Sequence, residues 1–153
     1  MEVKTFTNKR NHTIYFLVDD EGKVIKPVYD YMLYMARNDK KVNTIKSVCY
    51  NLKLYFDWLS IVNMNYKDAV AKKSKDNKGI IENLSSFKMW LKYPNYDEKI
   101  IDLKKQTAKR TTSTINQIMG SVFCFYDYLV INGNIEEFSM YQKVKDNSQF
   151  RGM

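Results

Sequence analysis

Apolar residues recur at steps of three and four along two long stretches of the sequence. This spacing places the apolar side chains on one side of an α-helix and the polar ones on the other. The apolar positions are Ile45, Val48, Cys49, Leu52, Phe56 and Leu59 in the first stretch, and Ile115, Ile118, Met119, Val122, Phe125, Tyr126 and Leu129 in the second. Two such long helices predict a mainly helical domain with a shared core.

Shorter patterns predict the remaining elements. Residues 13–26 combine β-forming runs with a turn in which Gly22 supplies a positive φ, so we expect a short hairpin. Pro27 suits the first turn of a following helix. A third amphipathic helix is expected over 80–91, and the polar stretch 72–79 before it is expected to be a solvated loop. The predicted fold is a mainly α bundle of four to five helices with a short N-terminal β-hairpin.

The ends of the two long helices carry recognisable capping residues. Asn43 is a good N-cap for the first. Thr114 and Gln117 have capping-box spacing at the start of the second, around 112–114. Gly133 stands where a left-handed residue would end that helix.

Composition limits the class of protein. The 153 residues, 44% of them hydrophobic, are enough for one domain with a real core. The start lacks the apolar run of a signal peptide, and no stretch approaches the roughly 18 apolar residues of a membrane span, so we expect a cytoplasmic protein. Cys49 and Cys124 lie far apart with only His12 as an imidazole partner, which predicts two reduced core residues and neither a zinc site nor a disulfide.

Few residues suit catalysis. A single histidine cannot build a histidine-based triad or metal cluster, and no glycine-rich phosphate loop is present. The acidic clusters 19–21 and 136–137 stand beside turn signals, where acids cap backbone amides. We therefore expect no enzyme activity and no cofactor.

Positive charge is concentrated in two stretches. The formal net charge is +8, and the segments 40–56 and 103–126 together carry eight of the 25 Lys and Arg but none of the 17 Asp and Glu. An even spread would place about four or five acids there. A basic, acid-free surface favours a polyanion such as duplex DNA.

Both stretches place cations and short polar side chains near the start of a helix, where anions are already favoured. The phosphate contacts expected are Lys40, Lys41, Lys46, Lys53, Lys109 and Arg110, near Lys104 and Lys105. The residues expected to position the duplex and contact base edges are Asn43, Thr44, Thr112, Asn116 and Gln117.

Two signatures in this order are familiar. The first comprises Tyr15-Phe16-Leu17-Val18-Asp19, Tyr31-Met32-Leu33-Tyr34-Met35, Asn43-Thr44-Ile45-Lys46 and Trp58-Leu59, and the second comprises residues 112–119, Phe125-Tyr126-Asp127-Tyr128-Leu129 and Gly133. Over residues 13–135 the chain resembles the N-terminal core-binding domain of tyrosine recombinases, the phage-integrase family. It departs from that pattern in lacking a proline after Gly133.

The resemblance implies a SAM-like helical domain, residues 1–135, that clamps one face of duplex DNA, with 136–153 starting the linker to a catalytic domain. The family's catalytic Arg, Lys, His-x-x-Arg and Tyr have no counterpart here. It further implies a parent enzyme that breaks and rejoins DNA through a tyrosine joined to the 3′ phosphate. The domain alone is expected to be a monomer, and in the parent it would meet other recombinase protomers.

Two other functions remain open. The chain could be a helical protein–protein interaction module whose lysines only coat the surface, or a helix-turn-helix regulator with two helices joined by three or four residues. The long separation 63–79 argues against such a turn between the second and third helices. DNA binding is favoured if Lys46, Lys53, Lys109 and Arg110 share one side of the folded domain, and the interaction module if they are scattered.

Overall fold

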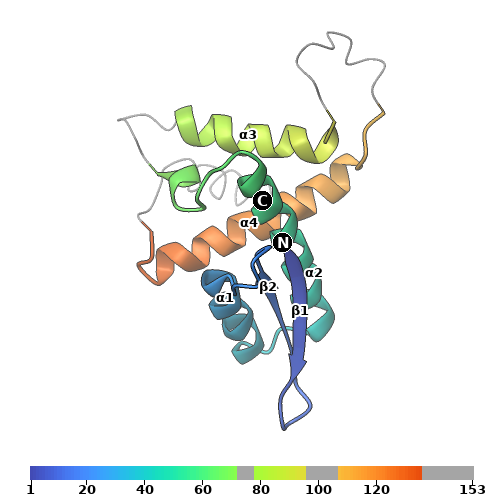
Figure 1. Cartoon of the computed structure of the whole chain (residues 1–153), viewed down its shortest axis with the longest axis vertical. Coiled ribbons are helices and arrows are strands. Elements are labelled where there is room, and N and C mark those ends of the chain that lie inside the picture. Colours follow the sequence, from blue (N-terminus) through green and yellow to red (C-terminus); the bar gives the residue numbers. More distant parts are fainter. Residues whose placement is uncertain (72–77, 96–106, 136–153) are drawn as a thin grey trace, which may run out of the picture.

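Four α-helices share one core, and a two-stranded antiparallel sheet packs on α1 and α2, in a computed structural model that describes residues 1–71, 78–95 and 107–135 (Figure 1). The elements are β1 (Glu2–Thr7), β2 (Thr13–Val18), α1 (Lys26–Arg37), α2 (Val42–Ile61), the short 3-10 helix η1 (Asp68–Val70), α3 (Lys78–Lys92) and α4 (Thr112–Ile131). The predicted mainly helical fold with an N-terminal hairpin is confirmed.

The hairpin differs from the predicted one in its partner strand. β2 pairs with β1, in a register running from Glu2 opposite Val18 to Thr7 opposite Thr13. The expected pairing of 13–18 with the residues after Gly22 is reduced to one isolated bridge between Val18 and Val24. A ladder of six residue pairs is more stable than a ladder of two. The mostly polar sequence of β1 lacks the apolar alternation from which a strand is predicted.

The turn after β2 forms as its residues predict. Gly22 has a φ of 79°, and the carboxylate of Asp19 accepts hydrogen bonds from the backbone N–H groups of Glu21 and Lys23, both at 2.9 Å. Asp19 is therefore a turn residue, as expected of that acidic cluster. The second cluster, 136–137, lies outside the described residues.

Four residues, Asn38–Lys41, join α1 to α2. Asp39 takes a φ of 59° in this connection. The N-cap of α2 is Lys41 and not the predicted Asn43, because the helix starts two residues earlier than an Asn43 cap would place it. No side chain caps its first turn. Asn43 therefore lies in the first turn of α2, and its side chain is exposed.

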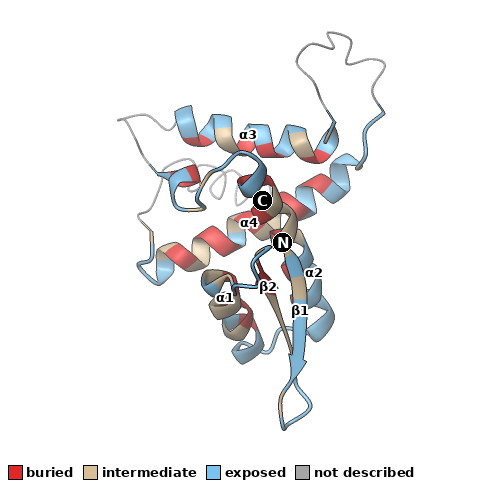
Figure 2. Cartoon of the chain, viewed as in Figure 1, coloured by how far each residue is buried: buried red, intermediate tan, exposed pale blue. Residues whose placement is uncertain are grey.

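The two long helices cross with their apolar sides together, as the buried stripes in Figure 2 show. At the crossing, the hydroxyl of Tyr126 donates to the backbone carbonyl of Tyr66 at 2.7 Å, so the neighbouring hydroxyl of Tyr55 donates to Tyr126. Burial raises the pKa of both tyrosines above the ordinary value, which keeps the hydroxyls neutral. This buried chain of hydrogen bonds ties α2, α4 and the 66–70 segment together.

The third helix closes the other end of the molecule. α3 begins at Lys78, inside the stretch predicted as a loop, whose residues 72–77 lie outside the described part. It packs on η1, where Asn83 donates to the carbonyl of Ala69 at 3.0 Å. Its buried side, which includes Phe87, meets Tyr55 of α2 with ring centroids 4.9 Å apart.

The caps of α4 are well defined. Its N-cap is Thr111, whose hydroxyl oxygen accepts from the backbone N–H of Thr114 at 3.3 Å, so the predicted capping pair Thr114 and Gln117 is displaced by one turn. Gly133 has a φ of 71° and ends the helix as predicted. Within the described residues, Cys49 and Cys124 form no disulfide. Cys49 is a core residue as predicted, but Cys124 is exposed, so its predicted core position is wrong.

Candidate nucleic-acid interface

One row of side chains runs along the outer side of α2. Lys46, Tyr50, Lys53 and Asp57 follow at steps of four, three and four residues, which places them above one another on the helix. The buried residues of α2 lie on the opposite side. Within the part of the chain that the structure describes, Lys46 is exposed and makes no ion pair.

The next cation in this row is already engaged. The ammonium of Lys53 lies 2.8 Å from a carboxylate oxygen of Asp57, and both side chains are partly buried. The other oxygen of Asp57 lies 3.0 Å from the amino terminus of Met1. Asp57 therefore neutralises much of the charge that the sequence alone assigns to this end of the row.

The segment leading into α4 lies beside the same end of α2. A hollow of about 490 Å³ is lined by residues from both elements, among them Asp57, Ser60, Lys109 and Arg110. The guanidinium of Arg110 donates to the carbonyl of Leu91 at 3.0 Å and so joins α4 to the end of α3. Lys109 is anchored through its backbone N–H to the carbonyl of Lys92 at 2.9 Å.

The four basic residues that discriminate between the hypotheses thus lie on one side of the domain. Lys109 and Arg110 adjoin Asp57, which pairs with Lys53, and Lys46 stands two turns before Lys53 in the same row. Two of the four, Lys53 and Arg110, have intramolecular partners, and two, Lys46 and Lys109, have exposed side chains.

The polar residues predicted to contact base edges do not all lie on one surface of the domain. Asn51 of α2 donates to the hydroxyl of Ser121 of α4 at 3.0 Å, and Gln117 lies one turn before Ser121, so Gln117 borders the seam between the two helices. Thr44 lies two turns before Asn51 on the same side. Asn116 is turned by about 140° around α4 from Ser121, at 100° per residue.

The remaining candidates lie at the two helix starts. Lys40, Lys41 and Asn43 are exposed at the start of α2, and Thr112 is exposed in the first turn of α4. Lys104 and Lys105 lie outside the described residues. The first turn of α2 therefore offers cations and backbone amides that no side chain caps, whereas Thr111 caps the first turn of α4.

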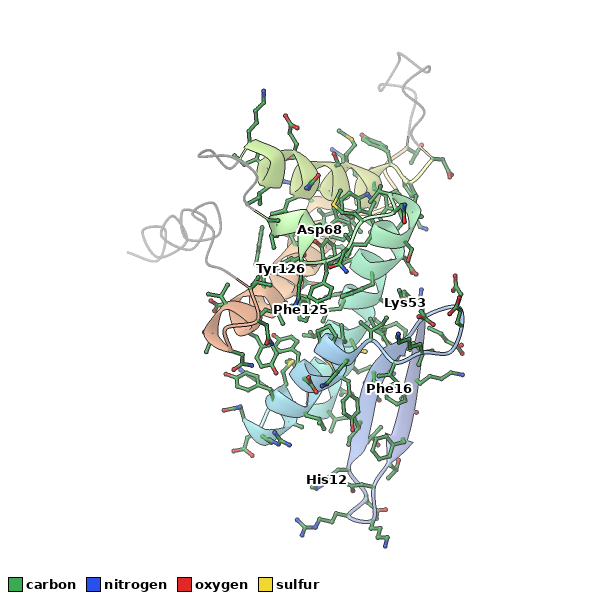
Figure 3. The ribbon with its side chains drawn as sticks, turned by 60° about the vertical axis from the view of Figure 1, so that its left-hand side comes forward. His12, Phe16, Lys53, Asp68, Phe125 and Tyr126 are labelled. Atoms are coloured by element: carbon green, nitrogen blue, oxygen red, sulfur yellow. The ribbon has the colours of Figure 1, made fainter. Side chains whose placement is uncertain are left out.

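A basic element was missed by the sequence-based interpretation. Lys9 and Arg10 stand at the tip of the β1–β2 hairpin, which projects from the body of the molecule, with His12 at its far end (Figure 3). The signal that could have found it is the absence of acids from residue 3 to residue 18, which hold three Lys and Arg.

The fold and this surface define a mainly helical domain with a basic side of the kind that suits a polyanion. The chain is similar to Transposase A from transposon Tn554 of Staphylococcus aureus, in strains Mu50 and N315 among others, at 30% identity over 147 residues. The similarity covers 92% of this chain and 36% of each relative. The chain thus spans about a third of the length of the curated relatives that it matches, and it is similar along nearly all of its own length to part of a transposon's transposase.

No protein-family model matches the chain. No solved structure matches it either. Among the described helices, none is both long and apolar enough to cross a membrane.

Proposed function

We propose that this chain is the duplex-DNA-binding domain of a site-specific recombinase that moves a mobile element. The observation that carries the proposal is the shared side formed by Lys46, Lys53, Lys109 and Arg110, the arrangement that favours DNA over a protein partner. The similarity to a transposon's transposase supports the same class of partner. The core-binding domain of the tyrosine recombinases is the specific type that the two sequence signatures support.

The start of α2 would lie against the DNA groove. The start of the helix carries Lys41, Asn43 and Lys46 at exposed positions. Lysines there would neutralise phosphates, and Asn43 could pair with base edges. Gln117 would meet the same duplex beside the middle of α2, and Lys109 beside the C-terminal end of α2, so that the duplex backbone would run along one side of the domain.

Strand cleavage would belong to another part of a longer protein. The tyrosine hydroxyls at the centre of this domain, on Tyr55 and Tyr126, are buried and hydrogen-bonded to each other, which is unsuited to attack on a phosphate. By the family resemblance, a tyrosine of the catalytic domain would form the covalent link to DNA, and the parent would assemble with other recombinase protomers on the DNA.

A helix-turn-helix regulator is the second candidate, and one observation favours it. The connection Asn38–Lys41 between α1 and α2 has the four-residue length that such a motif requires. A regulator of this type binds as a dimer to two half-sites about one helical turn apart. The recombinase domain is expected to bind a single site as a monomer, so the stoichiometry on one duplex distinguishes the two candidates.

The test is fluorescence anisotropy of the chain on a labelled duplex of about 25 base pairs at several salt concentrations. With about four to six phosphates contacted, the log–log salt slope should be roughly −3.6 to −5.4, from 0.9 per phosphate. The variant Lys46→Glu/Lys109→Glu should lose more than about 60-fold at 0.1 M salt, since each contact contributes a factor of about 8 there.

The matched control is Lys67→Glu/Lys88→Glu, which makes the same charge change at two exposed positions near η1 and on α3. We avoid Arg110 in the test pair because its bond to the carbonyl of Leu91 makes it part of the fold. Absence of binding by the folded wild-type chain at low salt would refute the proposal, as would equal losses in the two variants.

A further inference from the structure

The β1–β2 hairpin carries its positive charge at the point farthest from the helices. Lys9 and Arg10 are exposed, and the loop 8–12 that holds them contains no acid. β1 is exposed along most of its length, while β2 is anchored through Leu17 and Val18, which are buried against the helices. The base of the hairpin therefore contributes buried residues to the fold, whereas Lys9 and Arg10 at its tip are exposed.

Hydrogen bonds within the tip hold its backbone in one conformation. The side-chain oxygen of Asn8 accepts from the N–H groups of Arg10 and His12 at 2.9 and 3.0 Å, and the N–H of Asn8 donates to the carbonyl of His12 at 3.0 Å. Asn11 takes the left-handed conformation, with a φ of 61°, that Asn tolerates. None of these bonds uses the side chains of Lys9 and Arg10, so both cations extend from an ordered backbone.

The hairpin runs along α2 in the direction opposite to the helix (Figure 1). Its start is fixed by the contact between Met1 and Asp57. From Met1 to Lys9 is about 26 Å at 3.3 Å per residue, and from Asp57 back to Val42 is about 22 Å at 1.5 Å per residue. The tip therefore reaches the start of α2 or passes it, at the end of the molecule where Lys40 and Lys41 lie exposed.

We infer that the hairpin tip is a second DNA-contacting element, in which Lys9 and Arg10 contact the backbone of the duplex beyond the segment covered by α2. A two-stranded ribbon has the width that a DNA groove admits. Because hydrogen bonds already order the backbone of this acid-free tip, contact of its two cations with phosphates costs little backbone entropy. This inference rests on the proposed function, because it names a further contact with the same duplex.

The test compares Lys9→Ala/Arg10→Ala with the control Lys67→Ala/Lys88→Ala, which removes the same charge at exposed positions far from the tip. Both are measured by anisotropy on a random-sequence duplex of about 25 base pairs, after circular dichroism has shown unchanged folding. The tip variant should bind about 60-fold more weakly at 0.1 M salt, with a salt slope shallower by about 1.8. The control should change by less than about 3-fold.

Hydroxyl-radical footprinting on a duplex selected from random sequences for tight binding by the wild-type chain adds a readout that a general loss of charge would not change. The tip variant should lose protection at one end of the footprint and keep the rest. If the wild-type chain binds but the tip variant matches the control in affinity, slope and footprint, the hairpin inference is overturned while the proposed function stands. If the wild-type chain itself fails to bind, both fall together.

Discussion

The two halves of α2 use the same kinds of residue for different purposes. In the C-terminal half, polar side chains are engaged within the molecule, as Tyr55 is with Tyr126 and Lys53 with Asp57. In the N-terminal half, the side chains of Lys41, Asn43 and Lys46 are exposed. Charge counted along a sequence therefore overstates what a partner can reach, because part of that charge already stabilises the fold.

The largest expected effect comes from the buried part of the C-terminal half. Tyr55→Phe removes the hydroxyl that donates to Tyr126 and leaves that acceptor partly unsatisfied. We expect the free energy of unfolding to fall by about 2 kcal/mol, with DNA affinity unchanged at temperatures where the variant is folded. Urea denaturation and anisotropy measure the two quantities. A loss of DNA affinity without a loss of stability would contradict the division of α2 into a structural C-terminal half and a DNA-binding N-terminal half.

The same hydroxyls predict how stability responds to alkaline pH. Burial raises the pKa of Tyr55 and Tyr126 in the folded state, so the unfolded chain loses these protons first. Stability is then fully present below the unfolded pKa of about 10, and above it falls by up to about 1.4 kcal/mol per pH unit for each tyrosine. Urea denaturation between pH 7 and 11 should show this decline, and a smaller slope in Tyr55→Phe. A decline that begins near pH 8 would contradict it.

A pair of single substitutions sharpens the comparison at the surface. Lys46→Ala should weaken DNA binding about 8-fold at 0.1 M salt, because one phosphate contact is lost. Lys53→Ala should weaken it less than about 2-fold, since its ammonium is held by Asp57. Both variants remove one exposed or half-exposed lysine from the same row, so each controls for the other in anisotropy titrations. Equal losses would show that the ion pair opens on binding.

The smallest effect expected is a gain. Asp57→Asn removes the carboxylate that holds Lys53, which frees that cation for a phosphate. We expect affinity to rise about 2- to 3-fold and the salt slope to steepen by up to about 0.9. Titrations at two salt concentrations would detect it. Weaker binding would contradict this prediction and would indicate that Asp57 orients Lys53 toward the duplex.

Much of the fold follows from apolar periodicity alone. Both long helices were predictable because their buried residues recur at helical steps, and Gly133 marks the end of the last one. β1 could not be predicted, because its mostly polar sequence has no regular apolar alternation. It forms a strand because its backbone pairs with β2. Capping differed from the prediction at both long helices: α2 begins at Val42 without a side-chain cap, and Thr111 caps α4 three residues before the predicted Thr114.

The residue types of the candidate site could be predicted from the sequence, but which of its cations are already engaged within the fold could not. The acid-free stretches pointed to Lys46 and Lys109, and the structure brings both to one side of the domain. The engagement of Lys53 and Arg110 depends on Asp57 and on the carbonyl of Leu91. The Leu91 contact joins residues distant in sequence, and no local pattern reveals it.

The most direct measurement of the central claim is a titration of the isotope-labelled chain with a duplex of about 25 base pairs, followed by backbone amide NMR shifts. Our account predicts that the largest shifts fall at residues 40–47, at 109–117 and at the hairpin tip, 8–12, and that α3 changes little. Shifts centred on α3 and η1, or none in a duplex excess at low salt, would contradict it.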